Sequence, residues 1–225
     1  MSRGVLMRRY KRFLADVRLE NGQRITMHCA NTGAMLGCST PGSVVYYSTS
    51  KNLNRKYPQT LEYVQSEQDH LACVNTAIAN KVVGEALNGD DIAEVQGLGE
   101  WQSEIRIPDE AGRFDFGIPS KVYIEVKSVT YLNDKRGLFP DATSARATKH
   151  VKALVRRIKA GERGILLFCV PHTGIERTSI AKQLDPTYYE AVREALDDGL
   201  EVLAYRCQLT LDEVKIDYAI PFTLD

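Results

Sequence analysis

The hydrophobic pattern of the chain changes near Val74, and this change limits the fold to two parts of different architecture. Before Val74, short alternating segments are separated by turn residues, and Asn21-Gly22 is a strong hairpin signal between the first two. The segments expected as strands are 12–19, 24–29, 44–47 and 60–67. About five short strands in so few residues predict a small barrel, with an OB-like fold, over residues 1–75.

After Val74 the pattern alternates between helices and strands. Asp185-Pro186 has the order of cap and proline that favours a helix start, and the apolar run 165–170 is typical of a buried central strand. Helices are expected over 75–87, 143–159 and 186–199, and strands over 102–107, 113–118, 121–127, 165–170, 200–209 and 214–220. This order predicts an α/β domain with a mixed central sheet over residues 76–225, and an α+β chain overall.

The composition excludes several classes of protein. Hydrophobic residues make up 44% and charged residues 26% of the chain, which is ordinary for a globular protein. No apolar run approaches the ~20 residues that a membrane span needs, and the N-terminus lacks the apolar stretch of a secretory signal. The five cysteines are odd in number and form no Cys-x-x-Cys pair. We therefore expect a cytoplasmic protein with no membrane partner, no disulfide framework and no zinc ribbon. The oligomeric state stays open.

The charges are unevenly distributed although the net charge is zero. Residues 1–79 hold ten Lys and Arg against five Asp and Glu, whereas residues 80–225 hold nineteen against twenty-four. A basic part that meets an anion and an acidic part that holds a cation would explain this division, and chance drift is the alternative.

The second part of the chain contains a candidate acidic centre. Because side chains alternate along strands, Glu125 and Lys127 share one face, and Asp115 joins them if the strands are neighbours. Glu104 would then lie on the same polar face. Carboxylates this close raise each other's pKa, and a divalent cation, Mg²⁺ or Mn²⁺, relieves the repulsion and can activate a water on a phosphate. Lys127 would orient that water or offset developing charge. The alternative is a solvated face with a Glu–Lys ion pair.

Two basic segments are candidate DNA-binding surfaces. The helix expected over 143–160 carries a basic stripe, and beside an acidic centre such a stripe would bind phosphates. In the segment 8–13, Arg and Lys residues are interspersed with Tyr10 and Phe13. OB folds bind nucleic acid with this combination, because nucleobases stack on the aromatic rings and the basic groove follows the backbone. A solvated helix face and core aromatic residues are the alternatives. The residues expected to contact DNA are Arg8, Arg9, Lys11, Arg12, Arg146, Lys149, His150, Lys152 and Arg156.

Several motifs together resemble the bacterial sugar fermentation stimulation protein family (SfsA). They extend through nearly the whole chain, with departures at Ala30 and Gly112, where Pro and Ser would be expected. The segments that carry the resemblance are 9–17, 28–35, 113–116, 123–130, 139–142, the pair Lys149-His150, and 199–205.

The resemblance implies an N-terminal OB-like domain and a C-terminal domain similar to PD-(D/E)xK nucleases. In that superfamily the motif acids hold Mg²⁺ and the lysine assists, which maps the catalytic positions onto Asp115, Glu125 and Lys127. A helical glutamate often completes the site, with Glu85 as the candidate and Glu104 competing.

The resemblance also implies sequence-tolerant DNA binding and a role as a regulator of maltose metabolism. Three functions follow as alternatives. The first is a DNA-binding protein with an intact metal centre, including the case of an active nuclease. The second is a binding module that only retains the nuclease scaffold, and the third is a sugar-metabolising enzyme. The last is the weakest, because the sequence contains no sugar-phosphate or nucleotide motif.

Overall fold

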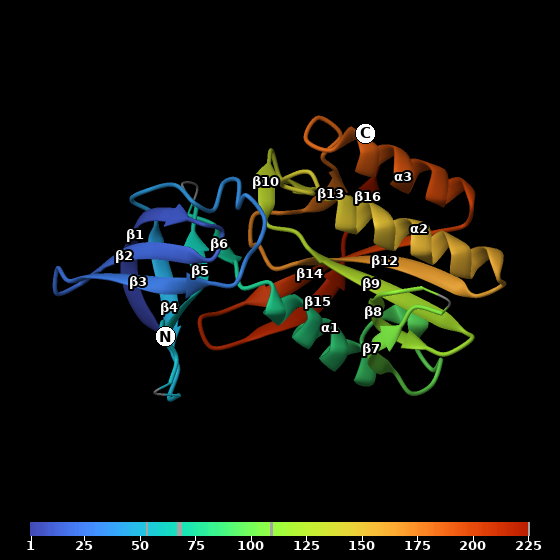
Figure 1. Cartoon of the computed structure of the whole chain (residues 1–225), viewed down its shortest axis with the longest axis horizontal. Coiled ribbons are helices and arrows are strands. Elements are labelled where there is room, and N and C mark those ends of the chain that lie inside the picture. The colour runs from blue at the N-terminus through green and yellow to red at the C-terminus, as the bar shows by residue number, and fades with distance from the viewer. Residues whose placement is uncertain (53, 67–68, 109, 225) are drawn as a thin grey trace.

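In the computed structural model, which describes residues 1–52, 54–66, 69–108 and 110–224, the N-terminal part is a closed barrel (Figure 1). Its strands follow the order β3-β2-β1-β4-β5-β6, and β3 also pairs with β5 at His28–Thr60 and Cys29–Leu61, which closes a barrel of β1 to β5. The strands are β1 (Ser2–Tyr10), β2 (Leu14–Leu19), β3 (Arg24–Cys29), β4 (Val44–Thr49), β5 (Gln59–Gln65) and β6 (Leu71–Cys73). The expected OB-like barrel is therefore confirmed.

Alternating positions on these strands fill the barrel. Leu6, Val17, Met27, Val45 and Leu61 come from five different strands and are at most 1% exposed. Period-two hydrophobic patterns bury one face of each strand, and the closed sheet joins these faces in a single core.

The beginning of the barrel differs from the expectation. Strand β1 was not predicted, and β2 starts at Leu14 rather than at Arg12. Lys11 and Arg12 have positive φ angles, 50° and 62°, and form the turn between β1 and β2. The end of the expected strand 60–67 includes Glu67, which lies outside the described residues.

The second part is built on a six-stranded mixed sheet, as expected. Its order is β15-β14-β12-β9-β8-β7, with β9, β12 and β14 parallel and the other pairs antiparallel. The strands are β7 (Gln102–Arg106), β8 (Arg113–Ile118), β9 (Val122–Ser128), β12 (Arg163–Val170), β14 (Glu201–Leu209) and β15 (Val214–Ala219).

Three helices cover the two faces of this sheet (Figure 1). Helix α1 (Ala77–Asn88) packs on one face, and α2 (Ala145–Lys159) and α3 (Pro186–Asp197) pack on the other. Val151 and Leu154 of α2 lie three residues apart on one helix face and are buried against the sheet. Ser144 and Asp185 cap α2 and α3 by accepting from backbone N–H groups in the first turn. The start of α3 follows the predicted Asp185-Pro186 signal, whereas the Ser144 cap was not predicted.

A second, small sheet was not predicted. Its order is β10-β11-β13-β16, formed by β10 (Tyr131–Asn133), β11 (Arg136–Phe139), β13 (Arg177–Ile180) and β16 (Phe222–Thr223), and a short 3-10 turn, η1 (Ala93–Val95), was also unexpected. Segments this short do not show a hydrophobic period, so only the tertiary pairing reveals them.

The barrel and the second part are joined by backbone pairing. The Cys73 N–H donates to the Pro171 carbonyl and the Thr173 N–H to the Leu71 carbonyl, each at 2.9 Å, and Ala72 bridges His172. A loop contact adds to this pairing, because the Met35 N–H donates to Asp141 Oδ2 at 2.6 Å. No helix among the described residues has the length and apolarity to cross a membrane.

Candidate metal centre and interdomain cleft

Asp115 and Glu125 lie on the neighbouring strands β8 and β9. The pairing of these strands ends at Phe116–Ile124, and the two acids occupy the next positions. Beyond this point side-chain hydrogen bonds replace the ladder: Asp115 Oδ2 accepts from the Val126 N–H and Oδ1 accepts from Asn80 Nδ2, both at 2.7 Å. Both oxygens of Asp115 are thus held by β9 and α1.

The strand alternation is broken at Asp115. Regular alternation would place Phe114 and Phe116 on one face, but Phe114 packs with α2 and α3, whereas Phe116 packs with the cluster around α1. The neighbouring strand β7 is irregular at this position. Its Glu104 has a φ of 53° and lies between the paired positions Ser103–Phe116 and Ile105–Phe114. This local change of direction lets Asp115 reach α1.

Glu125 is 2% exposed and stands at the centre of a polar cluster. Its Oε1 contacts both Lys127 Nζ and His150 Nδ1. Its Oε2 is also buried but has no hydrogen-bond partner among the described residues. A buried anionic oxygen without a donor is costly, so this atom has spare capacity for a cation.

The pKa values of the two acids shift in opposite directions. Burial raises the pKa of Asp115, the charge of Glu125 raises it further, and the Val126 N–H, Lys127 and Asn80 offset this only in part. Burial also tends to raise the pKa of Glu125, but His150 and Lys127 outweigh it and the pKa is lowered. The pair therefore contains one firmly ionised acid and one acid that binds a proton more readily.

The structure brings neither candidate third carboxylate, Glu104 or Glu85, into contact with this pair, and their role as a cation ligand stays a prediction. Glu104 is exposed and faces Arg113 at 4.0 Å, because the irregular backbone of β7 turns it away. Glu85 is exposed on α1 and pairs with Lys81 at 3.7 Å. Across the part of the chain that the structure describes, no three His, Cys, Asp or Glu side chains form a metal-binding group.

His150 has a different place from the one expected. It was assigned to the DNA-binding rim, but it is 7% exposed and contacts Glu125 inside the site. The sequence contained a signal for its burial: His150 is three residues after Ala147 and four before Leu154, and residues at these spacings share a helix face. Ala147 and Leu154 are both buried. Asn80, which orients Asp115, was missed entirely because it carries no charge.

The basic segment 8–12 divides into different roles. Arg9 is directed inward and donates to the carbonyls of Arg12, Asn31 and Gly33, each at 2.8 Å, so it holds a loop instead of a phosphate. Arg8 pairs with Asp16 at 2.7 Å. Lys11 and Arg12 are exposed on the turn that follows β1.

The predicted basic stripe of α2 is exposed but largely paired. Lys149 donates to the Ala111 carbonyl at 3.3 Å, and Lys159 pairs with Asp198 at 3.0 Å. Arg156 forms an ion pair with Glu110. Arg146 and Lys152 are exposed at the first turn and the middle of the helix.

A cleft of about 500 Å³ lies between the barrel and the second part, directly beside the acidic pair. Asn80 and Lys127, which hold Asp115 and Glu125, are part of its wall. The barrel contributes Arg12 and residues 31–33; the second part contributes Asn80, Val126, Lys127, Thr130, Tyr131, Phe139, Asp141 and Arg146, among others.

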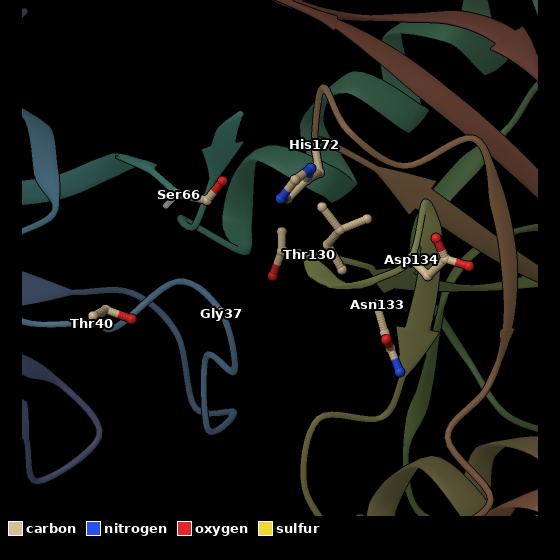
Figure 2. Close-up of a pocket in the computed structure, with 8 residues that line it drawn as sticks. Gly37, Thr40, Ser66, Thr130, Asn133, Asp134 and His172 are labelled. Atoms are coloured by element: carbon tan, nitrogen blue, oxygen red, sulfur yellow. The ribbon is translucent and has the colours of Figure 1, made fainter. Parts of the chain in front are cut away.

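A second cavity, of about 250 Å³, opens along the same interface (Figure 2). Gly37, Thr40 and Ser66 line it from the barrel, and Thr130, Leu132, Asn133, Asp134 and His172 line it from the second part. Burial lowers the pKa of His172 to about 4, so this imidazole is neutral at pH 7. Its Nδ1 accepts from the Gly174 N–H at 3.0 Å.

All five cysteines are buried free thiols. Burial raises the pKa of Cys38 and of Cys73 to about 12. Cys169 and Cys207 lie on neighbouring strands with their sulfur atoms 3.5 Å apart. Buried thiols of high pKa act as small hydrophobic residues, and the expectation that they bind no metal stays a prediction.

Comparison with known proteins assigns the chain to a family. The family profile described as the "Sugar fermentation stimulation protein RE domain" matches residues 77–213, and the "SfsA N-terminal OB domain" matches residues 7–74. A relative from Pseudoalteromonas translucida (strain TAC 125), the "Sugar fermentation stimulation protein homolog", is 45% identical over 226 residues, 96% of this chain and 95% of the relative.

A solved structure has the same fold. The structure of Pyrococcus furiosus SfsA in complex with Ca²⁺ matches with a TM-score of 0.87 over 99% of this chain and 96% of that one. At 21% identity this likeness concerns the fold alone. From the two matching domains and the close relative, the chain belongs to the sugar fermentation stimulation protein (SfsA) family.

Proposed function

We propose that this protein binds DNA with little sequence preference and holds one divalent cation, Mg²⁺ or Mn²⁺, at Asp115 and Glu125. The observation that carries the proposal is the buried acidic pair beside a cleft with cationic walls. Lys127 connects the two features, since it contacts Glu125 and also lines the cleft.

The residues present fit a small hard cation. Glu125 Oε2 lacks a donor, and the charge of Glu125 raises the pKa of Asp115, so a cation between the acids would relieve both penalties. Mg²⁺ commonly uses one or two carboxylates and completes its shell with waters and substrate phosphates, which suits a site with two acids. The Pyrococcus furiosus SfsA structure is a complex with Ca²⁺, which also prefers oxygen ligands, and this supports a divalent cation in the same fold.

Residues around the acidic pair would have separate roles beside a bound cation. Asn80 and His150 orient the two carboxylates, and Lys127 stands where a phosphate in the cleft would meet it. A bound cation would supply charge neutralisation at the phosphate and an activated water. Lys127 must leave Glu125 to approach a phosphate, and its ammonium would then offset the charge that develops there.

DNA binding is supported by the cations Arg12 and Arg146, which line the cleft, and by Lys152, which is exposed farther along α2. Contacts to phosphates carry no sequence information, so binding through them tolerates any sequence. The family name links the chain to sugar fermentation, and a regulatory role in maltose metabolism would act through this DNA binding.

An active nuclease is the second candidate, and the contact of Lys127 with Glu125 favours it. A lysine is dispensable for simple cation binding but useful in phosphodiester hydrolysis. The test is incubation of the pure protein with single-stranded, double-stranded and branched DNA plus Mn²⁺, with Asp115→Asn as the control. Cleavage by the unmodified protein alone would establish the enzyme, whereas equal traces from both would point to a contaminant and leave a binding protein.

A further inference from the structure

The interdomain cleft has the volume of a pocket for a small ligand. Clefts of roughly 300 to 1,000 Å³ enclose ligands of drug size, and this cleft is about 500 Å³. A double helix is far wider than such a space. Proteins that act inside pockets of this kind take single-stranded DNA or a nucleotide extruded from the duplex.

The cleft walls carry cations from three separate elements. Arg12 comes from the turn after β1, Lys127 from β9 and Arg146 from α2. The lining carboxylate, Asp141, is already engaged, because the Met35 N–H donates to it. Lys127 contacts Glu125, but Arg12 and Arg146 pair with no carboxylate among the described residues. These two arginines therefore favour an anionic chain, such as the backbone of a nucleic acid, along the walls.

Aromatic rings stand among these cations. Tyr131 and Phe139 line the cleft and are half-buried, so each keeps part of its surface accessible. Basic grooves with aromatic rings bind single strands, because unpaired bases stack on the rings regardless of sequence. Paired bases in a duplex cannot stack in this way.

The barrel wall of the cleft is held in place before any ligand arrives. Arg9 donates to the carbonyls of Asn31 and Gly33, and Asn31 Oδ1 accepts from the Gly33 N–H at 2.9 Å. This fixes residues 31–33 opposite Lys127 and Arg146. This wall of the cleft is therefore preformed by the fold.

The second cavity does not suit the same ligand (Figure 2). It meets the cleft at Thr130, but Asp134 is its charged lining residue and His172 is neutral at pH 7. Its lining contains no Lys or Arg among the described residues. A phosphate backbone is thus favoured in the cleft and disfavoured beyond Thr130.

We infer that the cleft between the barrel and the second part binds one DNA strand, either a free end or a strand separated from its duplex, and leads it past Lys127. This rests on the proposed function and adds the class of substrate. The strand would place its phosphates on Arg12, Lys127 and Arg146 and stack a base on Tyr131.

The test measures the fluorescence anisotropy of two labelled probes at equal salt without divalent cation: a mixed-sequence single strand, and a duplex of the same sequence closed by hairpins at both ends. We expect the single strand to bind about tenfold more tightly, because stacking of one base contributes a factor of this order. Arg12→Ala, Arg146→Ala and Tyr131→Leu should each remove most of this preference. Arg24→Ala is the matched control, since Arg24 is exposed at the start of β3 and does not line the cleft.

The outcomes separate the two claims. Equal affinity for both probes, or equal losses from Arg24→Ala and Arg12→Ala, would overturn the single-strand inference and leave DNA binding intact. Failure of both probes to bind would overturn the proposed function and this inference together.

Discussion

Asp115 and Glu125 are chemically similar acids at adjacent strand positions, and their neighbours make them different. Glu125 contacts two basic side chains, so its pKa is lowered despite burial. Asp115 accepts from two neutral donors and faces the charge of Glu125, so its pKa is raised. Without a cation, Asp115 is the acid of the pair whose ionised form is destabilised by its surroundings at neutral pH.

This difference predicts that the stability of the unmodified protein, compared with that of Asp115→Asn, depends on pH. A raised pKa in the folded state means that protonation favours folding: the contribution is complete below the unfolded pKa of about 4 and is lost as the pH rises through the folded pKa. The free energy of unfolding of the unmodified protein, relative to Asp115→Asn, should therefore increase as the pH falls from 7 towards 4. Urea unfolding in EDTA across this range measures it, and a constant or opposite difference would contradict the assigned shift.

Lys127 competes with a cation for Glu125. Lys127→Met keeps the length of the side chain and removes its charge, so we expect Mn²⁺ to bind about as tightly or several-fold more tightly, because like charges repel. Any DNA cleavage should be lost. Mn²⁺ titration and the cleavage assay together check this, and weaker Mn²⁺ binding by Lys127→Met would show that the lysine supports the cation site.

The sequence was sufficient to predict that Asp115, Glu125 and Lys127 lie together, because β8 and β9 follow each other in the chain and Glu125 and Lys127 are two residues apart on one strand. It placed Glu104 with them wrongly, since nothing in a hydrophobic pattern reveals a left-handed backbone in mid-strand. It also missed Asn80 as a partner of Asp115, because that contact depends on how α1 packs on the sheet.

Among the secondary-structure elements, α2 combines a buried face with a basic exposed face. Arg156 is paired with Glu110, whereas Lys152 is exposed on the same stripe. DNA affinity should fall steeply with salt, and Lys152→Ala should flatten the plot of log K against log salt by about one unit if it meets a phosphate. Arg156→Ala should flatten it less, because its partner carboxylate already neutralises it. Binding that does not depend on salt would contradict phosphate contacts.

Long elements were predicted and short ones were not. The three helices and the six strands of the central sheet have strong periods or caps, and the structure has each of them within a few residues. The sheet of β10, β11, β13 and β16 forms from segments of two to four residues, which are too short to show a hydrophobic period. Strand β1 was hidden because Arg8 and Arg9 suggested a DNA-binding surface in place of a strand.

At the scale of the molecule, Asp141 of the second part lies close to Gly33 of the barrel loop and accepts from the Met35 N–H. A β-carbon at Gly33 would come within 2.7 Å of Asp141 Oδ2, so Gly33→Ala must displace this carboxylate from the Met35 N–H. We expect a loss of about 1 to 3 kcal/mol in the free energy of unfolding. The loss should be smaller in an Asp141→Ala background, and a double-mutant cycle measures the difference. Additive effects would show that the two residues do not interact.

The proposed function depends above all on a divalent cation that Asp115 and Glu125 bind beside the cleft. Isothermal titration calorimetry with Mn²⁺ tests this site, on the unmodified protein, Asp115→Asn, Glu125→Gln and the control Glu104→Gln. We predict one site per chain in the unmodified protein and in Glu104→Gln, and loss of that site in the other two variants. Binding that survives Asp115→Asn and Glu125→Gln, or no binding by the unmodified protein, would contradict the proposed cation site.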